Sequence, residues 1–292
     1  MPDFEALLLG GSVTGHVRMD IPKLTFRAET KVRGLELRQA LAAEDNPGLP
    51  IIPLHWGSRM DIDATTTWVA DFKHVDSRGS SVWTPPVSPV PGQIPTAAHF
   101  EFHFDMDGKQ FELSPGEITT SSSRIQFRGS LSMVNSSLDM AVDTDDVSLW
   151  DDFINRLRGL DAEPEVIAGR FHWQGHLTGP LDGPTFTGHA KGTEAKYGAL
   201  YWDELEAELT YSPDQLHLQR GRARRGRSSA ELELMLALDN WGFTPDSDWT
   251  FDVNLVGADT DDVQHLLGTS YPAHGMLSGQ FHDDLSGGGE DR

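Results

Sequence analysis

The chain lacks cysteine entirely and is poor in basic residues. Without cysteine, its 292 residues hold no disulfide framework and no thiolate metal site. The 23 Lys and Arg residues stand against 45 Asp and Glu, which gives a formal net charge of −22. Such a surface repels phosphate backbones, so we expect no nucleic-acid partner. No apolar run approaches the roughly 20 residues that a membrane-spanning helix needs.

Helical periodicity and catalytic motifs are also scarce. Three short helices are predicted, at 35–43, 147–157 and 262–267, each near a Thr/Asp cluster or a glycine that can start it. No nucleophile elbow, phosphate-binding loop, dinucleotide-binding turn or histidine–metal helix is present in the sequence. We therefore expect a protein that is not an enzyme and uses no cofactor.

What the chain has in abundance is apolar–polar alternation with a period of two. Phe100, Phe102 and Phe104 share one face of a predicted strand, and His99 and His103 lie on the other. On the order of 17 to 20 such runs occur, far above the strand number of a mean sheet. Turn signals separate them at 107–108, 181–184, 212–214 and 240–242. The sequence thus predicts an all-β fold, an elongated, curved and antiparallel-rich sheet with two or three short helices.

One five-residue motif recurs, which indicates a chain built from repeats. Asp-Thr-Asp-Asp-Val stands at 143–147 and again at 259–263, and a weaker copy of the surrounding pattern covers 26–41. Clustered carboxylates suit calcium, but the glycine and glutamate spacing of an EF-hand loop is missing, so we interpret the motif as helix capping. The histidine pairs 99/103 and 172/176 lack a third ligand. We predict no metal site.

A proline-rich stretch at 85–95 predicts a linker. It would separate an amino-terminal β segment with a short helix (1–84) from a repeat-built groove segment (96–282). Residues 283–292 are predicted to form a flexible tail. The chain opens within a strand-like run and stops in a glycine-rich stretch, so we expect a fragment of a longer protein.

The cadence of residues 169–188 carries a family resemblance. Its "Gly-x-apolar-x-Gly-x-apolar-x-Gly-Pro-Leu-x-x-Pro-x-apolar-x-Gly" pattern, followed by strands at 202–211, 215–223 and 230–238, resembles the AsmA-like and TamB-like envelope proteins. The resemblance covers 97–282, with a looser fit over 1–80. It implies a curved β-sheet groove that conducts or shields phospholipid or another acyl-chain lipid and supports outer-membrane biogenesis. It also implies a periplasmic location, an inner-membrane anchor in missing parts of the parent chain, and an outer-membrane barrel protein as a partner.

The alternating strands supply the residues expected to line that groove. These are Phe100, Phe102, Phe104, Ile125, Phe127, Leu131, Phe171, Trp173, Leu177, Leu205, Leu209, Leu232, Leu234, Leu236, Leu238, Trp249, Phe251, Val253 and Leu255. A basic cluster in an acidic chain, Arg222, Arg224, Arg225 and Arg227, is the expected contact for lipid head groups at the groove margin.

Two other interpretations stay open at this point. Composition alone favours a sealed structural or adhesive β-sandwich array that carries no lipid, because monomers rarely expose large apolar patches. A carbohydrate-binding β module would use Trp56, Trp68 and Trp83 as exposed aromatic platforms, although such residues are equally typical of a core.

Overall fold

The computed structural model describes residues 3–43, 56–70, 72–90, 93–150, 167–198, 200–244, 246–266, 272 and 274–285. Within these ranges the chain is mostly antiparallel β-structure, which confirms the predicted all-β fold. The described residues form 18 strands, in keeping with the number of alternating runs. Sixteen of them belong to one sheet in which the strand order follows the chain order, and β1 and β18 are its first and last strands.

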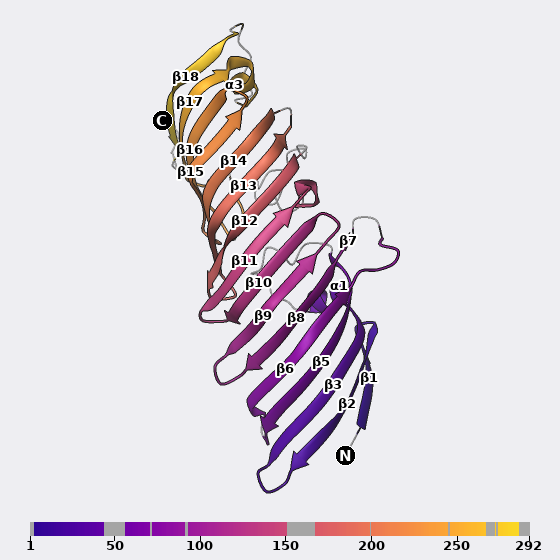
Figure 1. The fold of residues 1–292 in the computed structure, drawn as a ribbon. Helices are drawn as coiled ribbons and strands as arrows, with labels where there is room; N and C mark the ends of the chain where they lie inside the picture. Colours follow the sequence, from indigo (N-terminus) through magenta and orange to yellow (C-terminus); the bar gives the residue numbers. More distant parts are fainter. Residues whose placement is uncertain are drawn as a thin grey trace. The chain divides into compact units, whose positions relative to one another are not determined.

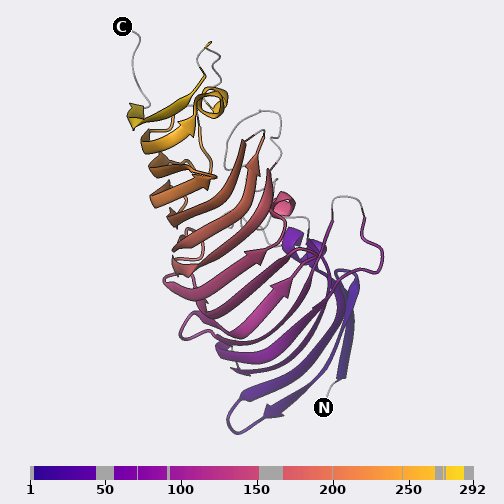
Figure 2. The same ribbon diagram turned by 45° about the horizontal axis from the view of Figure 1, so that its top comes forward.

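The chain divides into two compact units. Unit 1 contains residues 1–141 and 177–184, and unit 2 contains residues 142–176 and 185–292. The strands of unit 1 follow one another from indigo to magenta in Figure 1, and Figure 2 shows them curving along their length. Its elements are β1 (Asp3–Leu8), β2 (Gly11–Asp20), β3 (Thr25–Glu36), α1 (Leu37–Ala43), β4 (Trp56–Gly57), β5 (Arg59–Val69), β6 (Lys73–Thr84), β7 (Ile94–Pro95), β8 (Ala97–Asp105), β9 (Gln110–Thr119), β10 (Ser123–Ser132) and most of β11 (Ser136–Thr144).

Unit 2 is built in the same way from long, sequential strands. Its elements are the 3-10 turn η1 (Val147–Trp150), most of β12 (Ile167–Gly179), β13 (Thr185–Tyr197), β14 (Leu200–Tyr211), β15 (Gln215–Arg225), β16 (Ser228–Ala237), β17 (Trp249–Asp259), α3 (Thr260–Leu266) and β18 (Met276–Leu285). The four predicted turns fall between β8 and β9, β12 and β13, β14 and β15, and β16 and β17.

The proline-rich stretch leaves and rejoins a single sheet. The strands on either side of it, β6 and β8, pair directly from Trp83↔Ala98 to Asp76↔Asp105. The end of the stretch forms β7, which pairs in parallel with β4 as a separate two-stranded sheet. The predicted linker is therefore an excursion between neighbouring strands, and the chain divides into its two units after residue 141 instead. In the predicted tail, residues 283–285 belong to β18, and 286–292 lie outside the described residues.

The predicted short helices have counterparts at the ends of three strands. Helix α1 begins at Leu37 because β3 stays paired with β5 up to Glu36. The prediction at 147–157 matches η1 over its first four residues, and 151–157 lie outside the described residues. Helix α3 begins at residue 260, and the last predicted position, 267, again lies outside.

The hydrogen bonds around the recurrent motif support its capping role. The Asp146 carboxylate accepts a hydrogen bond from the Ser148 backbone N–H at 3.0 Å. The Asp259 carboxylate accepts one from the Asp261 N–H at 2.9 Å. Both satisfy a backbone donor of the first turn that has no partner inside the helix. Among the described residues no group of three potential metal ligands occurs.

The repeat corresponds to six strands. β3, β11 and β17, which precede the three helical turns, are the third, ninth and fifteenth strands of the sheet. The same interval separates two bulged strands, β9 and β15, the seventh and thirteenth. Each carries a Leu-x-x-Gly sequence at its register shift, at 113–116 and 218–221. The repeat therefore includes backbone irregularities as well as apolar periodicity.

Candidate functional site

Strand register in unit 1 brings its predicted lining residues onto one face. Phe104 and Leu131 both lie opposite Phe111 of the strand between them. On the same face Ile125 pairs with Ile118. Rings touch along the face: the Phe100 and Phe127 centroids are 5.7 Å apart, and those of Phe102 and Phe111 are 5.4 Å apart. All six predicted residues are therefore brought together: Phe100, Phe102, Phe104, Ile125, Phe127 and Leu131. We call this side of the strands the apolar face of unit 1.

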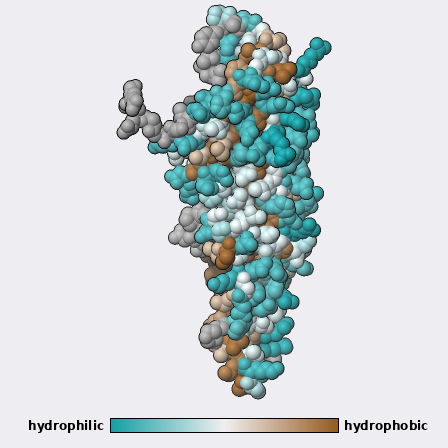
Figure 3. Space-filling view, turned by 90° about the vertical axis from the view of Figure 1, so that its left-hand side faces the viewer, coloured by the Kyte–Doolittle hydropathy of each residue, from teal (hydrophilic) through white to brown (hydrophobic). Residues whose placement is uncertain are grey.

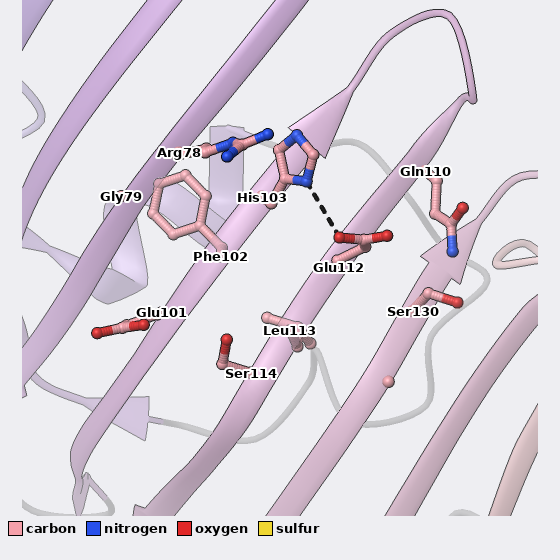
Figure 4. Close-up of a pocket in the computed structure, with 11 residues that line it drawn as sticks. Arg78, Gly79, Glu101, Phe102, His103, Gln110, Glu112, Leu113, Ser114 and Ser130 are labelled. Carbon is pink, nitrogen blue, oxygen red and sulfur yellow. Dashed lines mark hydrogen bonds and ion pairs between the residues drawn. The ribbon is translucent and has the colours of Figure 1, made fainter.

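Glycines on neighbouring strands make room for these rings. Phe102 lies opposite Gly79, where an added Cβ would lie 2.8 Å from the ring. Phe127 lies opposite Gly116, where an added Cβ would lie 2.7 Å from the ring. Figure 4 shows the Phe102 side chain extending toward the strand of Gly79. Aromatic rings that cover glycines in this way lie along the sheet instead of standing upright on it. The apolar side chains therefore form a thin layer close to the backbone of the sheet.

Unit 2 presents a ladder of leucines on the corresponding face. Leu234 lies between Leu218 on β15 and Phe251 on β17, and Leu232 pairs with Val253. Trp249 and Leu255 continue the face along β17, opposite Leu236 and Ala230. The predicted residues of β14, Leu205 and Leu209, pair with Ala223 and Leu218 on the same side. We call this side the apolar face of unit 2.

The remaining predicted residues of this set lie on β12 and beyond β16. Phe171, Trp173 and Leu177 alternate with polar residues along β12. Trp173 contacts Phe186 of β13 at a centroid distance of 6.4 Å. Leu238 lies just beyond the end of β16, and its backbone N–H donates to the Asp214 carbonyl oxygen at 2.8 Å. It therefore belongs to the loop between β16 and β17.

No second layer covers either apolar face among the described residues. Every substantial packing contact joins neighbouring strands of the sheet, the β4–β7 pair, or a short helix to a strand next to it in the chain or the fold. Of the predicted lining side chains, four are buried: Ile125, Phe127, Trp173 and Leu177. The others are half-buried. Figure 3 shows hydrophobic residues on the surface between hydrophilic ones. A sealed sandwich would bury these side chains against an opposing sheet.

The apolar face of unit 1 extends over strands β3, β5 and β6, which supply none of the predicted lining residues. Val32 pairs with Ile62, and Phe26 stacks on Trp68 with 5.3 Å between ring centroids. The apolar alternation at 26–32 could have identified β3 as part of this face. On β5 and β6 the alternation is weaker, because hydroxyl residues such as Thr66 and Ser77 take positions on the apolar face. The hydroxyl groups of these two residues lie 2.9 Å apart on neighbouring strands.

The tryptophans of the carbohydrate-binding alternative are not exposed platforms. Trp56 is buried. Trp68 and Trp83 are half-buried on the apolar face, where Trp83 contacts Phe100 at 5.8 Å and Trp68 stacks on its neighbours. Their indole rings belong to the same surface as the predicted lining residues.

The basic cluster is divided between a strand and a turn. Arg222 pairs in register with Glu206 and Glu231, and Arg224 contacts the Glu204 carboxylate at 3.3 Å. These two guanidinium groups therefore lie on the polar face, opposite the leucine ladder. Arg225 ends β15 opposite Ser228, and Arg227 lies in the turn that follows. Two of the four predicted head-group contacts therefore lie on the polar face of β15, and two lie at its end or in the turn after it.

The polar face is held by cross-strand pairs between histidine or basic side chains and carboxylates. His103 Nε2 lies 2.6 Å from Asp76, and its Nδ1 lies 3.0 Å from Glu112, so one imidazole connects β6, β8 and β9. The hydrogen bond to Asp76, and then the one to Glu112, raises the pKa of His103. Lys191 and Glu204 pair across β13 and β14, which raises the pKa of the lysine and lowers that of the glutamate.

A shallow polar depression of about 870 Å³ surrounds His103 (Figure 4). It lies beside the bulge of β9, where Pro115 lacks the N–H that an interior strand residue would donate. Glu101, Ser114 and Ser130 line it together with the histidine. A second depression lies at the bulge of β15, beside Arg220 and Arg222. Both follow from the local bending of the sheet and hold no cluster of three potential metal ligands in the described part of the chain.

No protein-family model, curated protein or solved structure gives a significant match to this chain. Within the described ranges, no helix is long and apolar enough to cross a membrane.

Proposed function

We propose that this chain binds the acyl chains of lipids along its apolar faces. In this proposal it is a segment of an AsmA-like or TamB-like cell-envelope protein that conducts or shields phospholipid in the periplasm and supports outer-membrane biogenesis. One observation carries the proposal: long rows of apolar side chains are only half-buried, and no second layer covers them within the described residues.

The energetics suit a lipid that is held firmly and still moves. Apolar contact stabilises by about 0.8 kcal/mol for each buried methylene, so burying ten methylenes of one acyl chain contributes roughly 8 kcal/mol. This contribution needs no directional partner, and a chain shifted by one methylene makes an equivalent set of contacts. Conduction then requires a continuous apolar surface and no reactive residue.

The polar face of the sheet suits contact with water, while the apolar face holds the acyl chain. Its carboxylates, histidines and basic groups pair across strands, as in Arg33 with Asp63 at 2.6 Å and His189 with Glu206 at 2.8 Å. These groups remain in contact with water while the other face holds hydrocarbon. An amphipathic sheet of this kind lets head groups stay hydrated at its margins.

The test is a lipid analysis of the purified chain with a matched pair of variants. Solvent extraction and mass spectrometry should recover phospholipid from the natural sequence. Leu234→Asn places an amide in the centre of the leucine ladder and should lower the recovered amount, whereas Glu233→Gln changes the neighbouring residue on the polar face and should not. A folded protein that carries no lipid and binds no added fluorescent phospholipid would support the sealed array instead.

A further inference from the structure

The loop between β16 and β17 folds back over the apolar face of unit 2. The Trp241 N–H donates to the carbonyl oxygen of Pro213 at 2.9 Å, which ties the loop to the turn between β14 and β15. Asp239 and Gly242 exchange two backbone hydrogen bonds around a two-residue turn. Both central residues have positive φ, 47° at Asn240 and 75° at Trp241. Asparagine tolerates this conformation, but the second position ordinarily takes glycine, so tryptophan is held there against a backbone cost.

An aromatic cluster explains what holds it. The Trp241 ring lies 4.7 Å from Tyr211 and 6.0 Å from Phe186, and Phe186 in turn contacts Trp173. The Tyr211 hydroxyl donates to the Trp241 carbonyl oxygen at 3.3 Å. Phe186 and Tyr211 are register partners on the apolar face, next to Leu209. The turn therefore covers the surface at the end of the leucine ladder.

The same cluster contains a buried hydrogen-bond donor without an acceptor among the described residues. Trp173 is 5% exposed, and its Nε1 is buried without a hydrogen-bond partner among the described residues. The indole lies against the neighbouring strand, because a Cβ added to Gly188 would be 2.8 Å from this nitrogen. A buried, unpaired N–H is costly and rare in folded proteins. The strained turn and the unpaired donor meet in one cluster.

We infer that this cluster is the closed form of a binding site for the ester carbonyl group of an acyl lipid. The inference rests on the proposed function. In the open form the Trp173 Nε1–H donates to the carbonyl oxygen, and the acyl chain continues along Leu209, Leu218 and Leu234. The turn at 239–242, with Trp241, is the lid. Tryptophan and tyrosine suit this position because each joins an apolar ring to one polar group, and an ester carbonyl is the first acceptor beyond a hydrocarbon chain.

A pair of matched lipids tests the donor. The probes are dihexanoyl phosphatidylcholine below its micelle concentration and its dihexyl ether analogue, which lacks the carbonyl groups. With ¹⁵N-labelled tryptophan, the ester lipid should shift the indole N–H signal of Trp173, assigned with Trp173→Phe, and the ether lipid should not. The ether lipid should bind about three- to tenfold more weakly, which is the worth of one net hydrogen bond. In Trp173→Phe both lipids should bind equally.

The outcomes separate the two proposals. Equal binding of both lipids to the natural sequence, with no shift of the Trp173 signal, would overturn the ester site and leave acyl-chain binding intact. If neither lipid binds, the proposed function fails and the ester site fails with it. Trp241→Gly relaxes the turn and removes the lid, so the ester lipid should associate several-fold faster with this variant. An unchanged association rate in a folded variant would exclude the lid.

Discussion

Two glycines on one strand offer a sharp test of how the apolar face of unit 2 is built. Gly188 and Gly192 lie four residues apart on β13, and their register partners on β14 are Leu209 and Leu205. A Cβ on Gly188 would lie 2.4 Å from the Gln174 carbonyl oxygen and 2.8 Å from Trp173 Nε1. A Cβ on Gly192 meets nothing closer than 3.5 Å. The same substitution thus meets a closed surface at Gly188 and ordinary van der Waals contacts at Gly192.

The two substitutions should change the free energy of unfolding in opposite directions. At Gly188 alanine must push β12 and the Trp173 indole away, and overpacking of this kind costs about 1–3 kcal/mol. At Gly192 alanine makes ordinary contacts and reduces the entropy of the unfolded chain, so Gly192→Ala should stabilise by about 0.4–1 kcal/mol. The two variants should therefore differ by roughly 1.5–4 kcal/mol in their free energy of unfolding.

Urea unfolding followed by far-ultraviolet circular dichroism measures this difference. At Gly188 the added methyl group clashes with the Trp173 indole and with the backbone of β12, including the Gln174 carbonyl oxygen. A double-mutant cycle with Trp173→Ala separates these two clashes. Gly188→Ala should cost less in the Trp173→Ala background, because the clash with the indole is absent there and only the clash with the backbone remains. Equal effects of Gly188→Ala and Gly192→Ala would refute the idea that rings of this face lie flat on glycines. Coupling near zero in the cycle would assign the clash to the backbone alone.

Two further predictions concern the polar face and the helix caps. Because its carboxylate partners raise the pKa of His103 above that of the unfolded chain, its contribution to stability is full below about pH 6.5 and is lost as pH rises through the folded pKa. The stability gap between the natural sequence and His103→Gln, measured by urea unfolding from pH 5.5 to 8.5, should therefore narrow with rising pH; a constant gap would contradict this. Asp259→Ala removes the acceptor of the Asp261 N–H and should cost about 1 kcal/mol in the same assay, whereas Asp259→Asn keeps an acceptor and should cost less.

Much of the fold could be predicted from the sequence because period-two alternation is a local signal. The alternation of apolar and polar residues within a strand shows which of its sides is apolar. Phe100, Phe102 and Phe104 could therefore be assigned to one face without knowledge of the adjacent strands. The helical turns after β3, β11 and β17 were equally local, since apolar residues and capping groups follow each strand directly.

The exact caps were not predictable from the repeated motif. In its first copy the fourth letter, Asp146, caps the turn, and in its second copy the first letter, Asp259, does so. The difference follows from where strand pairing stops relative to the motif: β11 ends at Thr144, the second letter, and β17 ends at Asp259, the first. Pairing of this kind depends on the neighbouring strand, which local sequence does not encode.

Long-range contacts could not be predicted either, because they also depend on residues far away in the sequence. Asn240, Trp241 and Gly242 were recognised as a turn, but the contact of Trp241 with Tyr211 and Phe186 depends on the path of a loop across two strands. The proline-rich excursion misled the domain prediction because composition reports the conformation of a stretch. It does not report whether the strands on either side of that stretch pair with each other, as β6 and β8 do.

The bulge of β15 explains why Arg222 and Arg224 lie on the polar face. Strict alternation counted from Leu218 would place residues 220, 222 and 224 on the apolar face. The bulge at 219–221 adds one residue to β15, so Gly221 and Ala223 take the apolar positions instead, opposite Leu232 and Ala230. Arg220, with φ of 51°, absorbs the irregularity, and Arg222 turns toward its glutamates. The Leu-x-x-Gly sequence at 113–116 shifts the alternation of β9 in the same way. A bulge motif therefore has to be located before the faces of such a strand are assigned, because one extra residue exchanges the side chains that meet lipid with those that meet water.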